Sequence, residues 1–230
     1  MGIMIAIVVV LSWITHLVYA LFFVVPDFSS PLFYLHILVQ GYLFTGLFIT
    51  GHDAMHGTVH SNRQINQTVG WISTFLFAGL KYKRLMKNHG LHHQYPGQKG
   101  DPDFYVKSQN FLKWFAVFMY RYVTIWQILI MAAIYNVLHI WFTDQKLLFL
   151  WIVPAFLGTL QMFYFGVYAP HKYPHKVSMK PFNSRTQRRN HLWAMLSCYF
   201  FGYHYEHHDN PRIPWWLLHQ KKNSHDKSKT

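Results

Sequence analysis

The stretch Leu32–Gly51, LFYLHILVQGYLFTGLFITG, contains no Asp, Glu, Lys or Arg and runs directly into His52-Asp-Ala-Met-His56. Twenty helical residues at about 1.5 Å each reach roughly 30 Å, the thickness of the hydrocarbon core of a bilayer. The stretch therefore predicts a membrane-spanning helix that leads into two histidines one helical turn apart.

Three further stretches of this kind are Ile3–Val25, Tyr122–Phe142 and Leu147–Ala169. Charged residues make up only 13% of the 230-residue chain, whereas a soluble domain carries about 25%. The fold class predicted is therefore an all-α integral membrane protein with four transmembrane helices.

The connections Pro26–Pro31 and Thr143–Lys146 are so short that each pair of spans must form an antiparallel hairpin. Both hairpin tips then lie on one side of the membrane. The other side receives 20 of the 21 Lys and Arg residues and 14 of the 17 histidines. By the positive-inside rule, the histidine-rich face and both termini are expected to be cytoplasmic, in a multi-pass protein of the cell membrane.

Shorter apolar segments occur on the histidine-rich side, at Thr68–Leu80, Phe111–Arg121 and Leu192–Gly202. They are too short to cross a bilayer and predict interfacial or re-entrant helices that form a cytoplasmic cap. Residues 1–220 are expected to form one domain. Residues 221–230 are polar and charged, and are expected to be a disordered tail.

Nine histidines on this side form a pattern. They comprise one HxxxH pair, two HxxHH triplets and a single residue after the fourth span: His52, His56, His89, His92, His93, His204, His207, His208 and His171. The i, i+3, i+4 spacing places imidazoles on one helix face, where they can bind a metal ion. One ion accepts four to six ligands, so nine histidines predict two ions. Imidazole binds iron, zinc and copper, and the ligands alone do not select among them.

Four acidic residues lie within or just after these motifs: Asp53, Asp101, Asp103 and Glu206. Metal-bound histidines usually donate their second N–H to a carboxylate or carbonyl oxygen, which makes these residues candidates for orienting the ligands. The alternative is that they are solvated or pair with Lys83, Arg84 or Lys87. The single cysteine, Cys198, excludes an internal disulfide and a cysteine-based metal site.

An HxxxH motif followed by two HxxHH motifs on four spans resembles the membrane fatty acid desaturase and hydroxylase superfamily. Within it, the chain most resembles the β-carotene ketolase (4-oxygenase) family. The matching segments are His52-Asp-Ala-Met-His-Gly57, Leu91-His-His-Gln-Tyr-Pro-Gly97, Asp101-Pro-Asp-Phe104, Phe201-Gly-Tyr-His-Tyr-Glu-His-His208 and Pro214-Trp-Trp216. The chain departs from that family's usual pattern at Gln98 and at Leu218-His219.

The resemblance implies two iron ions (Fe²⁺) that activate O₂ and electrons from a ferredoxin-like donor. It implies a carotenoid substrate that enters from the membrane lipids. The allylic C4 methylene of a β-carotene-type ring would become a ketone by successive hydroxylations. His171 would be the additional ligand, with His175 close enough to be the alternative, and Trp215 and Trp216 would contact the substrate.

Two other functions are open. An acyl desaturase or a carotenoid ring hydroxylase would use the same metal centre. A non-catalytic protein that binds or transports metal or haem would place ligands within the spans, where His16, His36 and His139 lie in separate helices without a shared spacing. The net charge of +13 does not require nucleic acid, because basic loops beside spans follow from orientation and anionic lipid.

Overall fold

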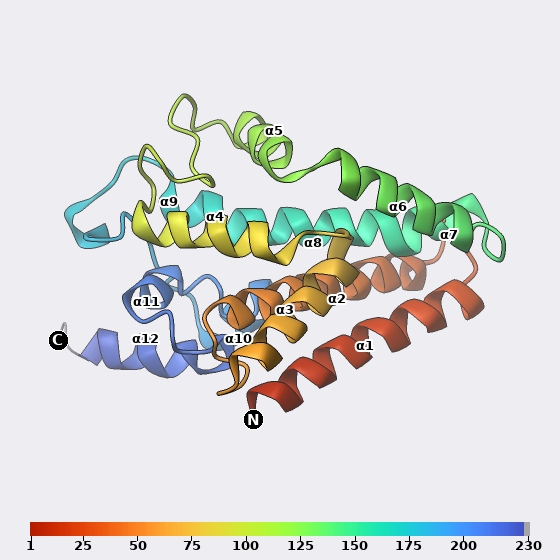
Figure 1. Ribbon diagram of the computed structural model, residues 1–230, viewed down its shortest axis with the longest axis horizontal. Coiled ribbons are helices and arrows are strands. Elements are labelled where there is room, and N and C mark those ends of the chain that lie inside the picture. Colours follow the sequence, from red (N-terminus) through yellow and green to blue (C-terminus); the bar gives the residue numbers. More distant parts are fainter. Residues whose placement is uncertain (228–230) are drawn as a thin grey trace.

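The computed structural model describes residues 1–227, which are mostly helical and contain no strand. In chain order the elements are α1 (Gly2–Phe23), α2 (Pro31–Met55), α3 (Arg63–Ala78), α4 (Tyr82–Gln94), α5 (Phe111–Tyr122), α6 (Ile125–Leu138), α7 (Asp144–Leu147), η1 (Leu148–Ile152), α8 (Val153–Phe163), η2 (Tyr164–Tyr168), α9 (Ala169–His171), η3 (Val177–Met179), α10 (His191–Cys198), α11 (His204–Asp209), η4 (Trp215–Leu217) and α12 (Leu218–Lys227). Figure 1 shows the long helices side by side, with the short helices α9, α11 and α12 at one end. The predicted all-α class is confirmed.

In the part of the chain that the structure describes, three helices are long and apolar enough to cross a membrane. They are α1, α2 and the continuous helix Asp144–His171, which comprises α7, η1, α8, η2 and α9. They coincide with three of the four predicted spans. The helix α2 continues past Gly51 and carries His52 within its last turn. The first histidine motif is thus a direct extension of an apolar helix.

The predicted span Tyr122–Phe142 has different boundaries in the structure. The helix α6 has only 14 residues, Tyr122 belongs to α5, and the two helices are bent by 87° relative to each other. The side chain of Thr124 caps α6 by accepting a hydrogen bond from the backbone N–H of Gln127 at 3.2 Å, and this cap begins a new helix. Residues 1–227 therefore contain three apolar helices of spanning length, or up to four if the bent pair counts as one span.

The two predicted hairpin tips lie at the same end of the molecule. Lys146 Nζ donates to the backbone carbonyl of Leu21 at 2.8 Å, and the rings of Phe28 and Phe149 lie 5.0 Å apart. In Figure 1 both tips are on the right, whereas α9, α11 and α12 are on the left. This arrangement agrees with two antiparallel hairpins that deliver the histidine motifs to one end.

The helix α2 is central and packs against α1, α3 and α8. Its approach to α8 depends on two glycines, because a Cβ atom on Gly158 would lie 3.0 Å from the carbonyl oxygen of Gly41. Small residues allow such close packing where no hydrophobic effect drives helices together. Close packing of α2 and α8 brings the ends that carry His52 and His171 toward the same site.

The long helix Asp144–His171 contains two π-helical segments, η1 and η2. Each is followed within two residues by a proline, Pro154 after η1 and Pro170 after η2. A proline has no N–H and its ring clashes with the carbonyl four residues earlier, and the wider π turn relieves that clash. The second π segment ends three residues before His171 and thereby sets the direction of that side chain.

The shorter predicted helices are present as α3, α5 and α10. The polar side chains of Asn62, Asn110 and Asn190 cap their first turns.

The helix α12 extends from Leu218 to Lys227 and includes the first residues of the predicted polar tail. Two contacts hold α12 against α11: Lys221 pairs with Asp209 at 2.7 Å, and His225 pairs with Glu206 at 2.9 Å. Residues 228–230 of the predicted tail lie outside the described residues. The division into a domain and a tail stays a prediction.

Two of the three histidines in the spans lie side by side. His16 Nε2 is 3.2 Å from His36 Nδ1, and His16 Nδ1 is 2.5 Å from Gln40 Oε1. The antiparallel packing of α1 and α2 creates this contact, which no spacing within one helix could predict. His139 lies apart at the tip, where it pairs with Asp144 at 3.0 Å.

Candidate metal centre

The nine predicted histidines come together in two groups. The five-histidine group is His52, His56, His89, His93 and His207. The four-histidine group is His92, His171, His204 and His208. Within each group, the candidate ligand nitrogens all lie within 4.8 Å of one another. The expectation of two ion-binding clusters therefore agrees with the geometry.

Each HxxHH triplet is divided between the two groups. In α4, His89 and His93 belong to the five-histidine group while His92 belongs to the other. In α11 the division is reversed, because the i, i+4 pair His204 and His208 joins the four-histidine group and His207 the five-histidine group. Neighbouring residues in a helix point about 100° apart, so the consecutive histidines of each triplet can serve two adjacent ions.

The nitrogen distances fit shared metal ions. His207 Nε2 lies 3.2 Å from His52 Nε2 and 3.0 Å from His93 Nε2. His208 Nε2 lies 3.1 Å from Nε2 of both His92 and His204. Two nitrogens bound about 2.1 Å from one ion at right angles are about 3.0 Å apart. A neutral imidazole has only one N–H, so three facing Nε2 atoms are better satisfied by a cation than by hydrogen bonds to one another.

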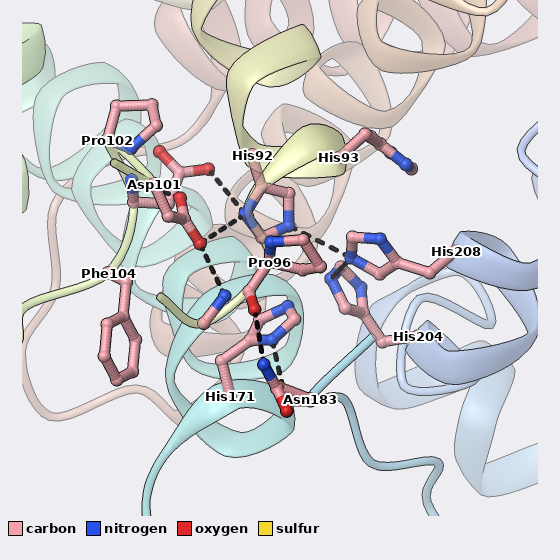
Figure 2. A network of polar contacts seen from close by, with 12 residues as sticks. His92, His93, Pro96, Asp101, Pro102, Phe104, His171, Asn183, His204 and His208 are labelled. Carbon is pink, nitrogen blue, oxygen red and sulfur yellow. Dashed lines mark hydrogen bonds and ion pairs between the residues drawn. The ribbon is translucent and has the colours of Figure 1, made fainter. Parts of the chain in front are cut away.

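His171 gives an independent test of the fit. Its Nδ1 lies 3.1 Å from the backbone carbonyl of Asn183, to which an N–H at this position donates. Its buried Nε2 faces the four-histidine group and has no hydrogen-bond partner within residues 1–227. Such a lone pair is costly to bury unless something binds it. Figure 2 shows His171 beside His92, His204 and His208.

Five of the grouped histidines outside the spans are held in the neutral form. Burial and neighbouring imidazoles hold the pKa of His89, His204, His207 and His208 well below the ordinary value of 6.5. The same causes lower the pKa of His93 to about 2. At neutral pH these side chains therefore present unprotonated nitrogens, the form that binds metal.

His92 has two acidic neighbours. Its Nδ1 lies 3.0 Å from Asp101 Oδ2 and 3.8 Å from Asp103 Oδ2. Burial acts to lower the pKa of His92, but the Asp101 carboxylate raises it to about 8. Asp101 also accepts the backbone N–H of Gly97 at 2.9 Å, which holds its carboxylate in place. Donation from Nδ1 to Asp101 would leave His92 Nε2 free to bind a metal.

Asp103 is held from the other side by Tyr122, whose hydroxyl donates a short hydrogen bond to Asp103 Oδ1. Arg121 contacts the same loop, and its Nη1 donates to the carbonyls of Pro102 and Phe104. The end of α5 therefore positions the loop that holds Asp101. This connection was missed in the sequence because no motif links Tyr122 to the histidines.

Asp53 performs a similar task for the first motif. Its Oδ1 lies 3.3 Å from His52 Nδ1, and its Oδ2 accepts the backbone N–H of Trp215 at 2.9 Å. The Trp215 ring packs edge-on against Tyr199 at 5.1 Å between centroids. Trp215 therefore positions Asp53 through its backbone. Neither Trp215 nor Trp216 lines the cavity over the histidines, and their contact with substrate stays a prediction.

The Glu206 carboxylate pairs with His225 of α12 at 2.9 Å. Glu206 lies between His204 and His207 in the sequence, and its side chain is fully buried. His175 lies outside both groups and its Nε2 donates to the backbone carbonyl of His171 at 2.7 Å. Of the two alternatives for the additional ligand, the geometry therefore favours His171. No local sequence pattern predicts that His225 pairs with Glu206 or that the Asn183 carbonyl contacts His171.

A cavity of about 120 Å³ lies directly over both groups. His52 and His89 of the five-histidine group and His92 and His204 of the other form its polar end. The rest of its wall is mainly apolar and includes Phe48, Phe77, Phe118, Met162, Val167 and Phe201. A ligand held there would be apolar and in contact with both candidate metal sites.

The family model described as fatty acid desaturase matches residues 29–127 and 106–227. No solved structure matches.

Curated relatives extend over most of the chain. Zeaxanthin 4-ketolase of Chlamydomonas reinhardtii is 37% identical over 94% of this chain and 52% of its own length. Beta-carotene 4-ketolase 3 of Haematococcus lacustris is 39% identical over 79% of this chain and 59% of its own length. Beta-carotene ketolase of Paracoccus sp. strain N81106 is 32% identical over 91% of this chain and 87% of its own length. The chain thus spans between half and three fifths of the two algal relatives.

Proposed function

We propose that this chain, which belongs to the fatty acid desaturase family, is an O₂-dependent membrane oxidoreductase that converts the C4 methylene of a β-carotene-type ring into a ketone. The observation that carries the proposal is the placement of two histidine groups at the polar end of one apolar cavity. The names of the relatives, zeaxanthin 4-ketolase and beta-carotene ketolase, support the substrate class and the reaction.

Two iron ions, one in each histidine group, would supply the activation of O₂. The chain's own residues would bind the ions, orient the ligands and exclude water. The nine imidazoles would hold the ions, and Asp53, Asp101 and the Asn183 carbonyl hold His52, His92 and His171 with their Nε2 atoms turned inward. The apolar wall excludes water and holds the ring with its allylic carbon toward the histidines.

The overall reaction balances in two oxidations. Each hydroxylation consumes one O₂, two electrons and two protons, inserts one oxygen atom into a C–H bond and releases one water. The second hydroxylation at the same carbon yields a geminal diol, which loses water to form the ketone. The C–H bond at C4 is weak because it lies beside the polyene, and for this reason we favour attack at C4.

The electrons would come from a ferredoxin-like protein. Basic side chains exposed at the histidine-rich end, such as Lys83, Lys99 and Arg189, would attract an acidic donor by long-range electrostatics. We further propose that four spans place this end and both termini in the cytoplasm of the cell, with the tips on the opposite side. The excess of Lys and Arg at the histidine-rich end supports this orientation.

Expression in cells that accumulate β-carotene tests the function directly. We expect 4-keto products in the extracted pigments and none from a matched His92→Ala variant. Unchanged carotenoid together with new double bonds in membrane lipids would show an acyl desaturase instead. Hydroxylated carotenoid without ketone would show a ring hydroxylase.

A metal or haem carrier would depend on polar groups within the spans. The His16 and His36 contact is the one described site of this kind between α1 and α2, and it lies outside both histidine groups. We expect His36→Gln to retain most ketone formation, because Gln preserves a polar partner for His16. If His36→Gln lost ketone formation while His92→Ala retained it, the result would support a metal or haem transporter instead.

A further inference from the structure

A groove along α6 adjoins the cavity over the histidines. The cavity and the groove share two lining residues, Val123 and Gln127. The groove encloses about 480 Å³, several times the volume of the cavity. Val123 lies in the bend between α5 and α6, and Gln127 lies in the first turn of α6. The two spaces therefore meet on either side of the same residues at the bend.

The groove runs lengthwise along one face of α6. Its wall on that helix consists of two rows spaced at i, i+4 and i+8, which begin at Gln127 and at Ile128 and end at Tyr135 and Asn136. From Gln127 to Asn136 the helix rises about 14 Å. The opposite wall includes Trp151 and Ala155 of the long helix Asp144–His171. This shape suits an extended chain better than a compact ligand.

The helix α6 presents an accessible surface along the groove that such a ligand could contact. None of its residues is buried, although it begins beside the metal-centre cavity. The polar groups at the far end of the groove are occupied by the protein itself, since Tyr135 donates to Asp144 and Asn136 donates to the carbonyl of Ala132. The free surface that remains along the groove is therefore mainly apolar.

We infer that this groove holds the polyene chain of the substrate whose ring occupies the cavity, with Gln127 at the junction. The inference rests on the proposed function. It places the extended part of the substrate in the groove along α6, away from the histidines where the ring reacts. The apolar lining matches a hydrocarbon chain, and the shared boundary at Val123 and Gln127 would let one molecule occupy both spaces. A substrate bound in this way reaches the histidines from the lipid.

A matched pair of substitutions tests the inference. Ala132 lines the groove, whereas its neighbour Ala133 points elsewhere on the same helix and is also exposed. Ala132→Phe fills the groove and is expected to reduce the carotenoid retained on the purified protein about tenfold, as overpacking does at a filled site. Ala133→Phe is expected to retain as much as the unaltered chain.

Three measurements are made on both variants in detergent: retained carotenoid by absorption, ketone formation in cells, and metal per chain. Equal metal in both variants shows that the histidine end is intact. The inference would be overturned if both variants retained the same amount of carotenoid. It would also be overturned if Ala132→Phe lost bound phospholipid but kept its carotenoid. Failure of the unaltered chain to form ketone while it still retains carotenoid would instead overturn the proposed function and leave the groove assignment standing.

Discussion

At the scale of single residues, His207 connects the first and second histidine motifs. Its Nε2 lies near Nε2 of both His52 and His93, which come from different helices. We expect His207→Ala to lower bound metal by about one ion per chain and ketone formation by more than about 100-fold, since even outer partners of ligands contribute about 10–100-fold. Elemental analysis of the purified protein and pigment analysis would measure both.

The control for this prediction is His139→Ala. His139 is half exposed at a hairpin tip, where it pairs with Asp144. Its replacement should leave both metal content and ketone formation close to those of the unaltered chain. Full metal content in His207→Ala would contradict the assignment of His207 to the five-histidine group.

Asp101 provides a second prediction at this scale, because it holds His92 and the backbone of Gly97 at once. Asp101→Asn keeps the shape of the side chain but removes the charge that accepts from His92. We expect about a 10–100-fold loss of metal affinity at the four-histidine group, measured by competition with a chelator. Asp209→Asn, at an exposed ion pair with Lys221, should bind metal normally. Equal affinities in the two variants would exclude an orienting role for Asp101.

At the scale of helices, the close packing of α2 and α8 makes a prediction about two glycines. A Cβ atom on Gly158 would lie 3.0 Å from the carbonyl oxygen of Gly41 and from Phe44 Cβ, whereas one on Gly90 of α4 meets nothing within 4 Å. Gly158→Ala should therefore lower the free energy of unfolding by about 1–3 kcal/mol. Gly90→Ala should leave it unchanged or raise it by up to about 1 kcal/mol, because Ala favours helix.

Thermal unfolding of the two variants in the same detergent compares the two effects. Both substitutions add one methyl group to a helical glycine, so intrinsic helix preference acts in the same direction in each. An equal change in unfolding temperature would mean that α2 and α8 separate readily enough to accept the methyl group.

The bend between α5 and α6 shows how far helices can be predicted from local sequence. The absence of charge from Tyr122 to Phe142 predicts one uninterrupted span, whereas the structure has a cap at Thr124 and an 87° bend. A threonine inside an apolar run can equally bond within a continuing helix. The contacts of Arg121 and Tyr122 with the Asp103 loop favour the bent form, and these contacts join segments that no hydropathy pattern relates.

At the scale of the whole molecule, clustering so many neutral histidines links stability to pH. The pKa values of His89, His207 and His208 lie far below 6.5 in the folded chain, and that of His93 lies at about 2. Below pH 6.5 the unfolded chain binds protons that the folded chain excludes, so stability falls as pH falls. His92 acts oppositely, because its pKa of about 8 gives stability that is present in acid and lost as pH rises through 8.

The depressed groups outnumber His92, so the net effect is destabilisation in acid. We expect the unfolding temperature of the metal-free protein to fall by about 5 °C or more between pH 7.5 and pH 5.5. Thermal unfolding followed by fluorescence in detergent at the two pH values measures this change in unfolding temperature. An unfolding temperature that stays constant or rises over this interval would contradict the neutral state of the clustered histidines.

The sequence alone determined three of the four predicted apolar helices, the end of the molecule that carries the histidines, and eight of the nine candidate ligands through their helical spacing. These are local properties, since hydrophobic length and angular position depend only on nearby residues. Only the tertiary structure divided the nine into groups of five and four, favoured His171 over His175, and opened the cavity and groove. The reason is that each group combines side chains from segments more than 100 residues apart, and a helix fixes directions about its own axis without specifying which neighbour it will face.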